Sequence, residues 1–187
     1  DKKDFFLQPL FNKGDKVKGY VHVYTGDGKG KTTAAFGLAL RAVGAGLKVF
    51  IGQFVKGMKY SELESLERFK GEIEVRQYGR DCFIHKDPEA EDIQLAREGL
   101  QEMQAVMASG DYQLVILDEA NIATFYRLFS IDELLQAVKG RAASVEVVIT
   151  GRKADPAVIE LADLVTEMRE VKHYYTEGVE ARDGIEK

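Results

Sequence analysis

The chain has 187 residues and a formal net charge of −5, with 26 Lys and Arg against 31 Asp and Glu. This length predicts one hydrophobic core that needs neither disulfides nor a structural metal. The single cysteine, Cys82, excludes a disulfide framework and a cysteine-based zinc site, and it favours a reducing compartment. The acidic balance argues against binding nucleic acid through net charge, and the apolar runs are too short to span a membrane. We therefore expect a soluble cytoplasmic protein.

Residues 1–19 form an N-terminal segment of mixed polar and aromatic character. Phe5, Phe6 and Phe11 stand among lysines there, and a disordered tail rarely carries three phenylalanines. Two interpretations stay open: the segment packs on its own domain, or it is an arm that covers a site or a neighbouring subunit. The rest of the chain, 20–187, is expected to form a single domain.

Apolar, β-branched segments alternate with helical patterns in this domain. Strands are expected at 20–25, 48–54, 73–78, 114–118, 145–150 and 164–168. Helices are expected at 31–43, 89–108 and 131–138, the last preceded by Ser130 and Glu133 at capping-box spacing. Several strands are apolar along their whole length, which is typical of parallel strands covered on both faces. The pattern predicts an α/β fold, a mostly parallel sheet with helices on both faces.

The strongest motif is Thr25-Gly26-Asp27-Gly28-Lys29-Gly30-Lys31-Thr32, between the first expected strand and the first expected helix. It matches the phosphate-binding P-loop, except that Thr25 stands where that pattern has its first glycine. The glycines allow successive N–H groups to converge on a polyphosphate at the helix N-terminus. Lys31 adds a positive charge between phosphates, and the Thr32 hydroxyl suits a Mg²⁺ ligand. The motif predicts a nucleotide site on a P-loop NTPase-like (RecA-like) fold.

Further polar residues follow the ends of other strands. Asp118 and Glu119 end an apolar strand, where an acid usually orients the magnesium ion of a P-loop directly or through water. Arg152 follows another strand, where its planar guanidinium suits phosphate. Arg41, late on the first helix, is a weaker candidate. Since ligands of open parallel sheets lie beyond the carboxyl ends of the strands, these residues are expected to share one site.

The reaction is not determined by these residues alone. An NTPase would use Glu119 as a base toward water, a kinase would bring an acceptor hydroxyl, and a third class of reaction attacks the ribose while the whole triphosphate leaves. The single cysteine argues against a zinc-bearing thymidine-kinase-like enzyme. His22, His85 and His173 give no support to a Ser-His-Asp constellation.

Taken together, the motifs resemble the P-loop type of ATP:cob(I)alamin adenosyltransferase. The matching stretches run in one order from about Gly19 to Glu186, at residues 25–37, 53–57, 117–119, 150–152, 162–168, 171–173, 178 and 184–186. The resemblance implies that cob(I)alamin attacks the 5′ carbon of ATP, so that adenosylcobalamin forms and triphosphate departs. It also implies that the P-loop grips ATP in a reversed sense, around the γ-phosphate. No general base is needed, because the nucleophile carries no proton.

Carried over residue by residue, the resemblance assigns Gly26 to Thr33 to the triphosphate. It assigns Mg²⁺ to Thr32 with the Asp118–Glu119 pair, Arg152 to phosphate and Arg41 to the nucleotide. The expected catalytic residues are Lys31, Thr32, Glu119 and Arg152. The expected ATP-binding residues are Gly26, Asp27, Gly28, Lys29, Gly30, Lys31, Thr32, Thr33 and Arg41, and the expected magnesium ligands are Thr32, Asp118 and Glu119.

The corrin face departs from the family pattern. The family places aromatic side chains under the corrin to displace its lower ligand, whereas this chain has Cys82 and Ile84 at those places and Phe83 between them. Phe83 is therefore our candidate for the corrin face, and Tyr78 is a weaker one. No Asp-x-His-x-x-Gly stretch supports ligation of the corrinoid by histidine.

The resemblance also implies partners. Residues 53–57 are expected to line the corrin side, and a flavin or flavodoxin-type reductase is expected to supply cob(I)alamin. Family members are commonly homodimers whose N-terminal segment covers the active site, a role that Phe5 to Phe11 suit by analogy. Two other functions stay open: a general P-loop NTPase, and a module that delivers adenosylcobalamin to a dependent enzyme.

Overall fold

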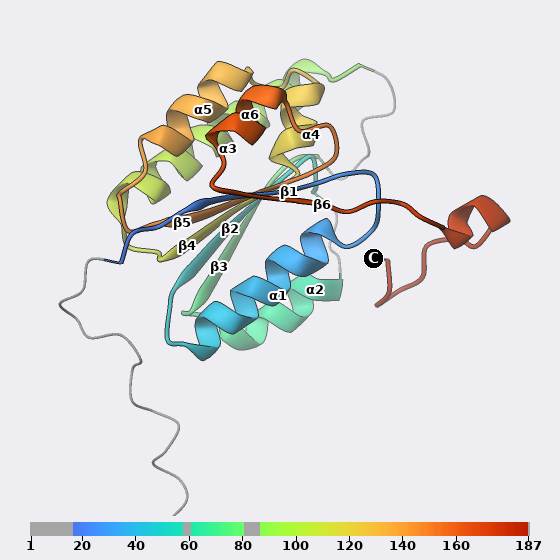
Figure 1. The fold of residues 1–187 in the computed structure, drawn as a ribbon, viewed down its shortest axis with the longest axis horizontal. Coiled ribbons are helices and arrows are strands. Elements are labelled where there is room, and N and C mark those ends of the chain that lie inside the picture. The colour runs from blue at the N-terminus through green and yellow to red at the C-terminus, as the bar shows by residue number, and fades with distance from the viewer. Residues whose placement is uncertain (1–16, 58–60, 81–86, 187) are drawn as a thin grey trace, which may run out of the picture.

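The computed structural model describes residues 17–57, 61–80 and 87–186. Its described part contains a six-stranded sheet of order β3-β2-β4-β5-β1-β6, in which every neighbouring pair is parallel (Figure 1). The strands are β1 (Val21–Thr25), β2 (Val49–Phe54), β3 (Ile73–Tyr78), β4 (Leu114–Asp118), β5 (Glu146–Thr150) and β6 (Leu164–Glu167). Each lies within one residue of an expected strand, so the predicted parallel α/β fold is confirmed.

Helices cover both faces of the sheet. On one face lie α1 (Lys31–Gly44) and α2 (Ser61–Leu66), and on the other lie α3 (Ala90–Ser109), α4 (Ala120–Phe125), α5 (Ile131–Lys139) and α6 (Pro156–Leu161) (Figure 1). Two 3₁₀ turns, η1 (Glu67–Phe69) and η2 (Tyr174–Glu177), complete the described elements. The three long helices match the expected ones, whereas the six-residue helices α2, α4 and α6 were not predicted. In the parts of the chain just described, no helix is long and apolar enough to cross a membrane.

Local signals set the helix ends. At the start of α5, Glu133 N donates to Ser130 Oγ at 3.1 Å and Ser130 N donates to Glu133 Oε2 at 2.6 Å, which confirms the predicted capping box. At the start of α6, Asp155 accepts a hydrogen bond from Ala157 N, and Pro156 occupies the first helical position. These caps fix the residues at which the two helices begin.

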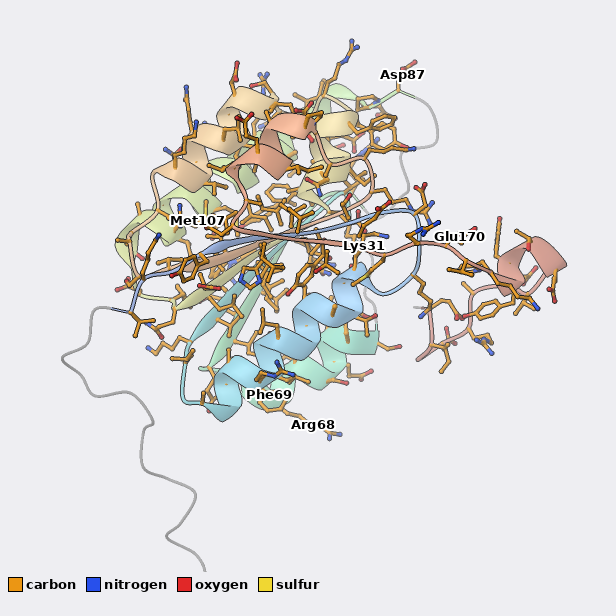
Figure 2. All side chains as sticks on the ribbon, in the orientation of Figure 1. Lys31, Arg68, Phe69, Asp87, Met107 and Glu170 are labelled. Carbon is orange, nitrogen blue, oxygen red and sulfur yellow. The ribbon has the colours of Figure 1, made fainter. Side chains whose placement is uncertain are left out.

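The core has two layers because strand side chains point alternately to the two faces of the sheet. On the α1 face, Ile116 packs in a cluster with Phe36. On the α3 face, Leu117 and Phe54 pack in a cluster with Met107, which Figure 2 labels. All five residues are buried, and a fully buried side chain of this size contributes about 1.5–3 kcal/mol of transfer free energy. These layers hold the ends of β2, β4 and β5 in fixed positions.

The edge strand β6 differs from the other strands. All four of its residues are exposed, although it pairs with β1 along its whole length. The chain then leaves the layers and carries η2 to one side of the molecule (Figure 1). This C-terminal segment, residues 168–186, exposes Val171, Tyr175 and Ile185.

Candidate functional site

The glycine-rich loop joins β1 to α1 at the carboxyl edge of the sheet. Gly30 begins α1 with φ 116°, a conformation that favours glycine. Lys31 is buried, and its Nζ donates to the carbonyl oxygens of Gly26 at 2.8 Å and Gly28 at 2.7 Å. Burial lowers the pKa of Lys31, and the nearby Glu119 carboxylate opposes this shift. Figure 2 shows Lys31 at the end of α1 that approaches the sheet. The ammonium group therefore lies where a phosphate cradle requires its lysine.

The C-terminal segment holds this loop from outside. Gly28 N donates to Met168 O at 2.7 Å, Met168 N donates to Thr25 O at 2.8 Å, and Lys29 Nζ donates to Ile185 O at 2.7 Å. A Cβ atom at position 28 would lie 2.7 Å from Met168 O, closer than real Cβ contacts allow. Glycine is thus required at this position by the approach of another backbone, in addition to any need of a phosphate.

Asp118 at the end of β4 is the centre of the site. Its side chain is fully buried, and four side chains donate hydrogen bonds to it. Oδ1 accepts from the hydroxyls of Thr32 at 2.8 Å and Thr150 at 2.7 Å, and Oδ2 accepts from Gln53 Nε2 at 3.1 Å and Lys56 Nζ at 2.8 Å. Burial alone would raise the pKa of Asp118, but Lys56 and the hydroxyls outweigh it, so the pKa is lowered. The carboxylate is ionised and fully satisfied.

Glu119 follows in a left-handed backbone conformation, with φ 60°. Its backbone N–H donates to Thr150 Oγ1 at 2.9 Å, which holds the turn between β4 and α4 against β5. Burial and the charge of Asp118 raise the pKa of Glu119. The guanidinium of Arg152 is close enough to lower the pKa of both Glu119 and Lys31. The predicted grouping of these two charged residues with the loop lysine is therefore present.

The donor atoms around Asp118 have the chemistry of a magnesium site. The Thr32 hydroxyl oxygen lies 2.8 Å from Asp118 Oδ1, and the Glu119 carboxylate follows directly in the chain. Hard oxygen donors of this kind suit Mg²⁺ and not the softer transition metals. The residues of this chain therefore fit the metal that a P-loop employs.

Other expected residues lie farther from this centre. Arg41 is exposed on the last turn of α1, ten residues after Lys31 and therefore about 15 Å along the helix axis. Asp27 and Thr33 are exposed on the loop and on the first turn of α1. The structure does not bring Arg41 to the cradle, and its contact with the nucleotide stays a prediction.

Only some of the residues expected on the corrin side belong to the part of the chain that the structure describes. Phe83 lies outside this part, and so do residues 1–16 of the expected active-site cover in residues 1–19. Tyr78, the weaker candidate for the corrin face, is buried against Phe54, and its hydroxyl donates to Glu102 Oε2 at 2.9 Å. Burial and this carboxylate raise the pKa of Tyr78. The observed role of Tyr78 is in the core.

Three contributors to the site were missed or misassigned by sequence reasoning. Thr150, Gln53 and Lys56 all donate to Asp118, whereas residues 53–57 were expected to line the corrin side and none of the three was expected to contact this acid. A signal existed for Gln53, which is the polar residue of an otherwise apolar strand and stands at the register position opposite Asp118. The adjacency of β2 and β4 that creates this register follows from the sheet order.

The parallel sheet and the glycine-rich loop opposite a buried strand-end acid define a P-loop NTPase-like α/β protein. The model of the family described as ATP:corrinoid adenosyltransferase BtuR/CobO/CobP matches residues 17–186, and the chain belongs to this family. The resemblance seen in the sequence is confirmed.

Several curated proteins are similar over most of their length. A corrinoid adenosyltransferase of Pseudomonas aeruginosa is 38% identical over 170 residues, covering 90% of this chain and 84% of the relative. A corrinoid adenosyltransferase of Escherichia coli K12 is 40% identical over 171 residues, covering 90% and 86%. The corrinoid adenosyltransferase CobA of Salmonella typhimurium is 37% identical over 176 residues, covering 93% and 88%.

Proposed function

We propose that this chain transfers the 5′-deoxyadenosyl group of ATP to the cobalt of cob(I)alamin or a related corrinoid and releases triphosphate. The observation that carries the proposal is the family match over residues 17–186, which spans both the phosphate cradle and the strand-end acids. The geometry of the phosphate cradle supports the part of this reaction that involves the leaving triphosphate.

In this reaction the electron pair of cobalt(I) forms the bond to C5′ while the C5′–O5′ bond breaks and its electrons leave with the triphosphate. The leaving group gathers negative charge, so a site that lowers the barrier must offer positive charge there. Lys31 and Arg152 supply it, together with N–H groups of the loop. Lys31 now donates to two loop carbonyls, and it exchanges them for phosphate oxygens when ATP binds.

Magnesium is proposed as the resident metal, with Thr32 and Asp118 as ligands and Glu119 as a ligand directly or through water. Mg²⁺ bound there would neutralise charge on the triphosphate. Asp118 is suited to this role because it is ionised and held by the hydroxyls of Thr32 and Thr150.

The remaining assignments rest on the family. We propose that the corrinoid enters beside residues 53–57 and that Phe83 contacts the corrin face. A homodimer with residues 1–19 as the active-site cover, and a flavin or flavodoxin-type reductase that supplies cob(I)alamin, complete the proposal. The single cysteine supports a cytoplasmic setting, where thiols stay reduced.

The test is an anaerobic incubation with ATP, Mg²⁺ and chemically reduced cobalamin, followed by optical spectra. We expect the light-sensitive spectrum of a cobalt–carbon bond to appear over many turnovers. Steady release of orthophosphate without corrinoid would instead indicate a general NTPase. One turnover with retention of the product would indicate a module that delivers adenosylcobalamin.

A further inference from the structure

Lys56 lies at the place where the two proposed metal ligands meet. Its Nζ is 2.8 Å from Asp118 Oδ2 and 3.5 Å from Thr32 Oγ1. One ammonium group therefore contacts both the carboxylate and the hydroxyl that the P-loop offers to a divalent cation. A divalent cation and an ammonium group repel each other at contact distance, so the two compete for these atoms.

The position of Lys56 is built into the fold. It follows Val55, a β-branched residue at φ 60°, where such residues are sterically disfavoured. On the other side, a Cβ at Gly79 would lie 2.6 Å from Lys56 N, so two backbones meet there closely. The side chain is only 15% exposed, although lysine usually keeps its ammonium group in water.

The charge of Lys56 is retained at this position. Its ammonium group lies 2.8 Å from the Asp118 carboxylate, and an ion pair at this distance favours the charged form. The ammonium therefore supplies a full positive charge beside a carboxylate that is otherwise bound only by neutral groups. In charge and in contacts it reproduces part of what a bound cation provides.

We propose that Lys56 is a positioning residue that stands in for the divalent cation: it holds Asp118 and Thr32 in place in the metal-free protein and yields them when the metal enters with the nucleotide. The part played by the nucleotide rests on the proposed function. Metal alone must compete with Lys56 for Asp118. A metal ion that arrives with a triphosphate also has phosphate oxygens as ligands. Other oxygens of the same triphosphate give the displaced ammonium group of Lys56 new anionic partners. Lys56 thereby makes metal and nucleotide bind cooperatively.

The test measures Mn²⁺ binding in the absence of nucleotide. The electron paramagnetic resonance signal of free Mn²⁺ reports how much of the metal remains unbound. Lys56→Gln removes the charge but keeps an N–H donor for Asp118, and we expect it to bind Mn²⁺ about tenfold more tightly than the wild type. Lys56→Arg keeps the charge and should bind Mn²⁺ as weakly as the wild type. Lys153→Gln, an exposed lysine beyond the end of β5, controls for the general loss of positive charge.

A lysine that merely satisfies a buried carboxylate would give a different result. Mn²⁺ affinity of Lys56→Gln equal to or weaker than that of the wild type would overturn the proposal, as would an equal gain in Lys153→Gln. Adding tripolyphosphate should tighten Mn²⁺ binding more in the wild type than in Lys56→Gln, since the variant has no competing ammonium to displace.

The wild-type chain gives a second readout that does not depend on the folding of a variant. A crystal structure with Mg²⁺ and tripolyphosphate should show Lys56 Nζ moved off Asp118 and within reach of a phosphate oxygen. An ammonium still 2.8 Å from Asp118 with the metal bound would contradict the proposal. Neither experiment contains a corrinoid, so failure of adenosyl transfer and failure of this inference are separate outcomes.

Discussion

Two regions of the molecule contact the glycine-rich loop, and they do so by different means. In the strand-end centre, Asp118 of β4 accepts a hydrogen bond from the Thr32 hydroxyl, and Gln53 of β2 and Thr150 of β5 donate to Asp118 in turn. The C-terminal segment binds the outside of the loop through carbonyl oxygens of Met168 and Ile185. Side-chain identity is therefore critical in the first region, whereas the second region contacts the loop through its backbone carbonyls.

The largest effect is expected at Lys31, which belongs to the loop that both regions hold. Lys31→Ala should lower the rate of adenosyl transfer by about 10³-fold, because the leaving triphosphate loses its buried cation. Single-turnover formation of the cobalt–carbon product measures this rate. Lys48→Ala, an exposed lysine just before β2, should leave the rate unchanged. Undiminished transfer by Lys31→Ala would contradict the site described here.

The next effect tests whether the C-terminal segment acts through its backbone. Gly28→Ala places a methyl group against Met168 O and the carbonyl of Arg169, so the loop or the segment must shift. We expect ATP affinity, measured by calorimetry, to fall about 10- to 100-fold, as for other overpacked positions. Gly37→Ala is the matched control: it lies on α1, no atom beyond its own helix backbone lies within 4 Å of the new Cβ, and it should stabilise the chain slightly. Equal ATP affinity in both variants would refute the close contact.

A buried charge pair outside both regions gives a reference for the exposed charges of the C-terminal segment. Asp92 on α3 is buried, and two hydrogen bonds from Arg80, each 2.7 Å long, lower the pKa of its carboxyl. The folded chain therefore binds this proton more weakly than the unfolded chain, and the pair stabilises the fold fully above the unfolded pKa of about 3.9. This stabilisation is lost as the pH falls through the lower folded pKa.

Asp92→Asn should thus lower the free energy of unfolding at neutral pH by about 2 kcal/mol and flatten its dependence on pH at the acid end. Urea unfolding at a series of pH values measures both. In the C-terminal segment, Arg182 and Tyr174 lower the pKa of Glu186 to about 2, but Arg182 is half exposed and solvent screens the pair. Arg182→Gln should leave the acid profile unchanged, and a profile that follows that of Asp92→Asn would remove the distinction.

The smallest effect is expected for an exposed side chain of the C-terminal segment. Val171 is 91% exposed, so Val171→Ser should change the free energy of unfolding by less than about 0.5 kcal/mol. Thermal melting measures this at sufficient precision. A large loss of stability would show that the Val171 side chain is packed against other residues. That result would contradict the exposed position of Val171 in the C-terminal segment.

The sheet was predictable from the sequence because its strands are short β-branched and apolar segments, several of them apolar throughout, that alternate with helical patterns. The helices α2, α4 and α6 were not, since six residues are too few to show a helical period. At α6 a local signal existed, because Asp155 and Pro156 form a typical helix start. At α4 the sequence showed only a strand end, with Asp118 as the last residue of β4 and Glu119 after it.

The loop, the strand-end acids and Arg152 were predictable because each follows a recognisable strand. The contact of Lys56 with Asp118 was not, because it depends on β2 lying beside β4 although β3 intervenes in the chain. Neighbours across a parallel sheet are set by crossover connections, which no local pattern reports.

The central claim is that ATP is held so that its sugar carbon, and not its terminal phosphorus, is attacked. Phosphorus-31 resonance spectra of the products formed from ATP, Mg²⁺ and cob(I)alamin test it most directly. Inorganic triphosphate is expected in amounts equal to the adenosylated corrinoid. ADP and orthophosphate as the products would contradict it.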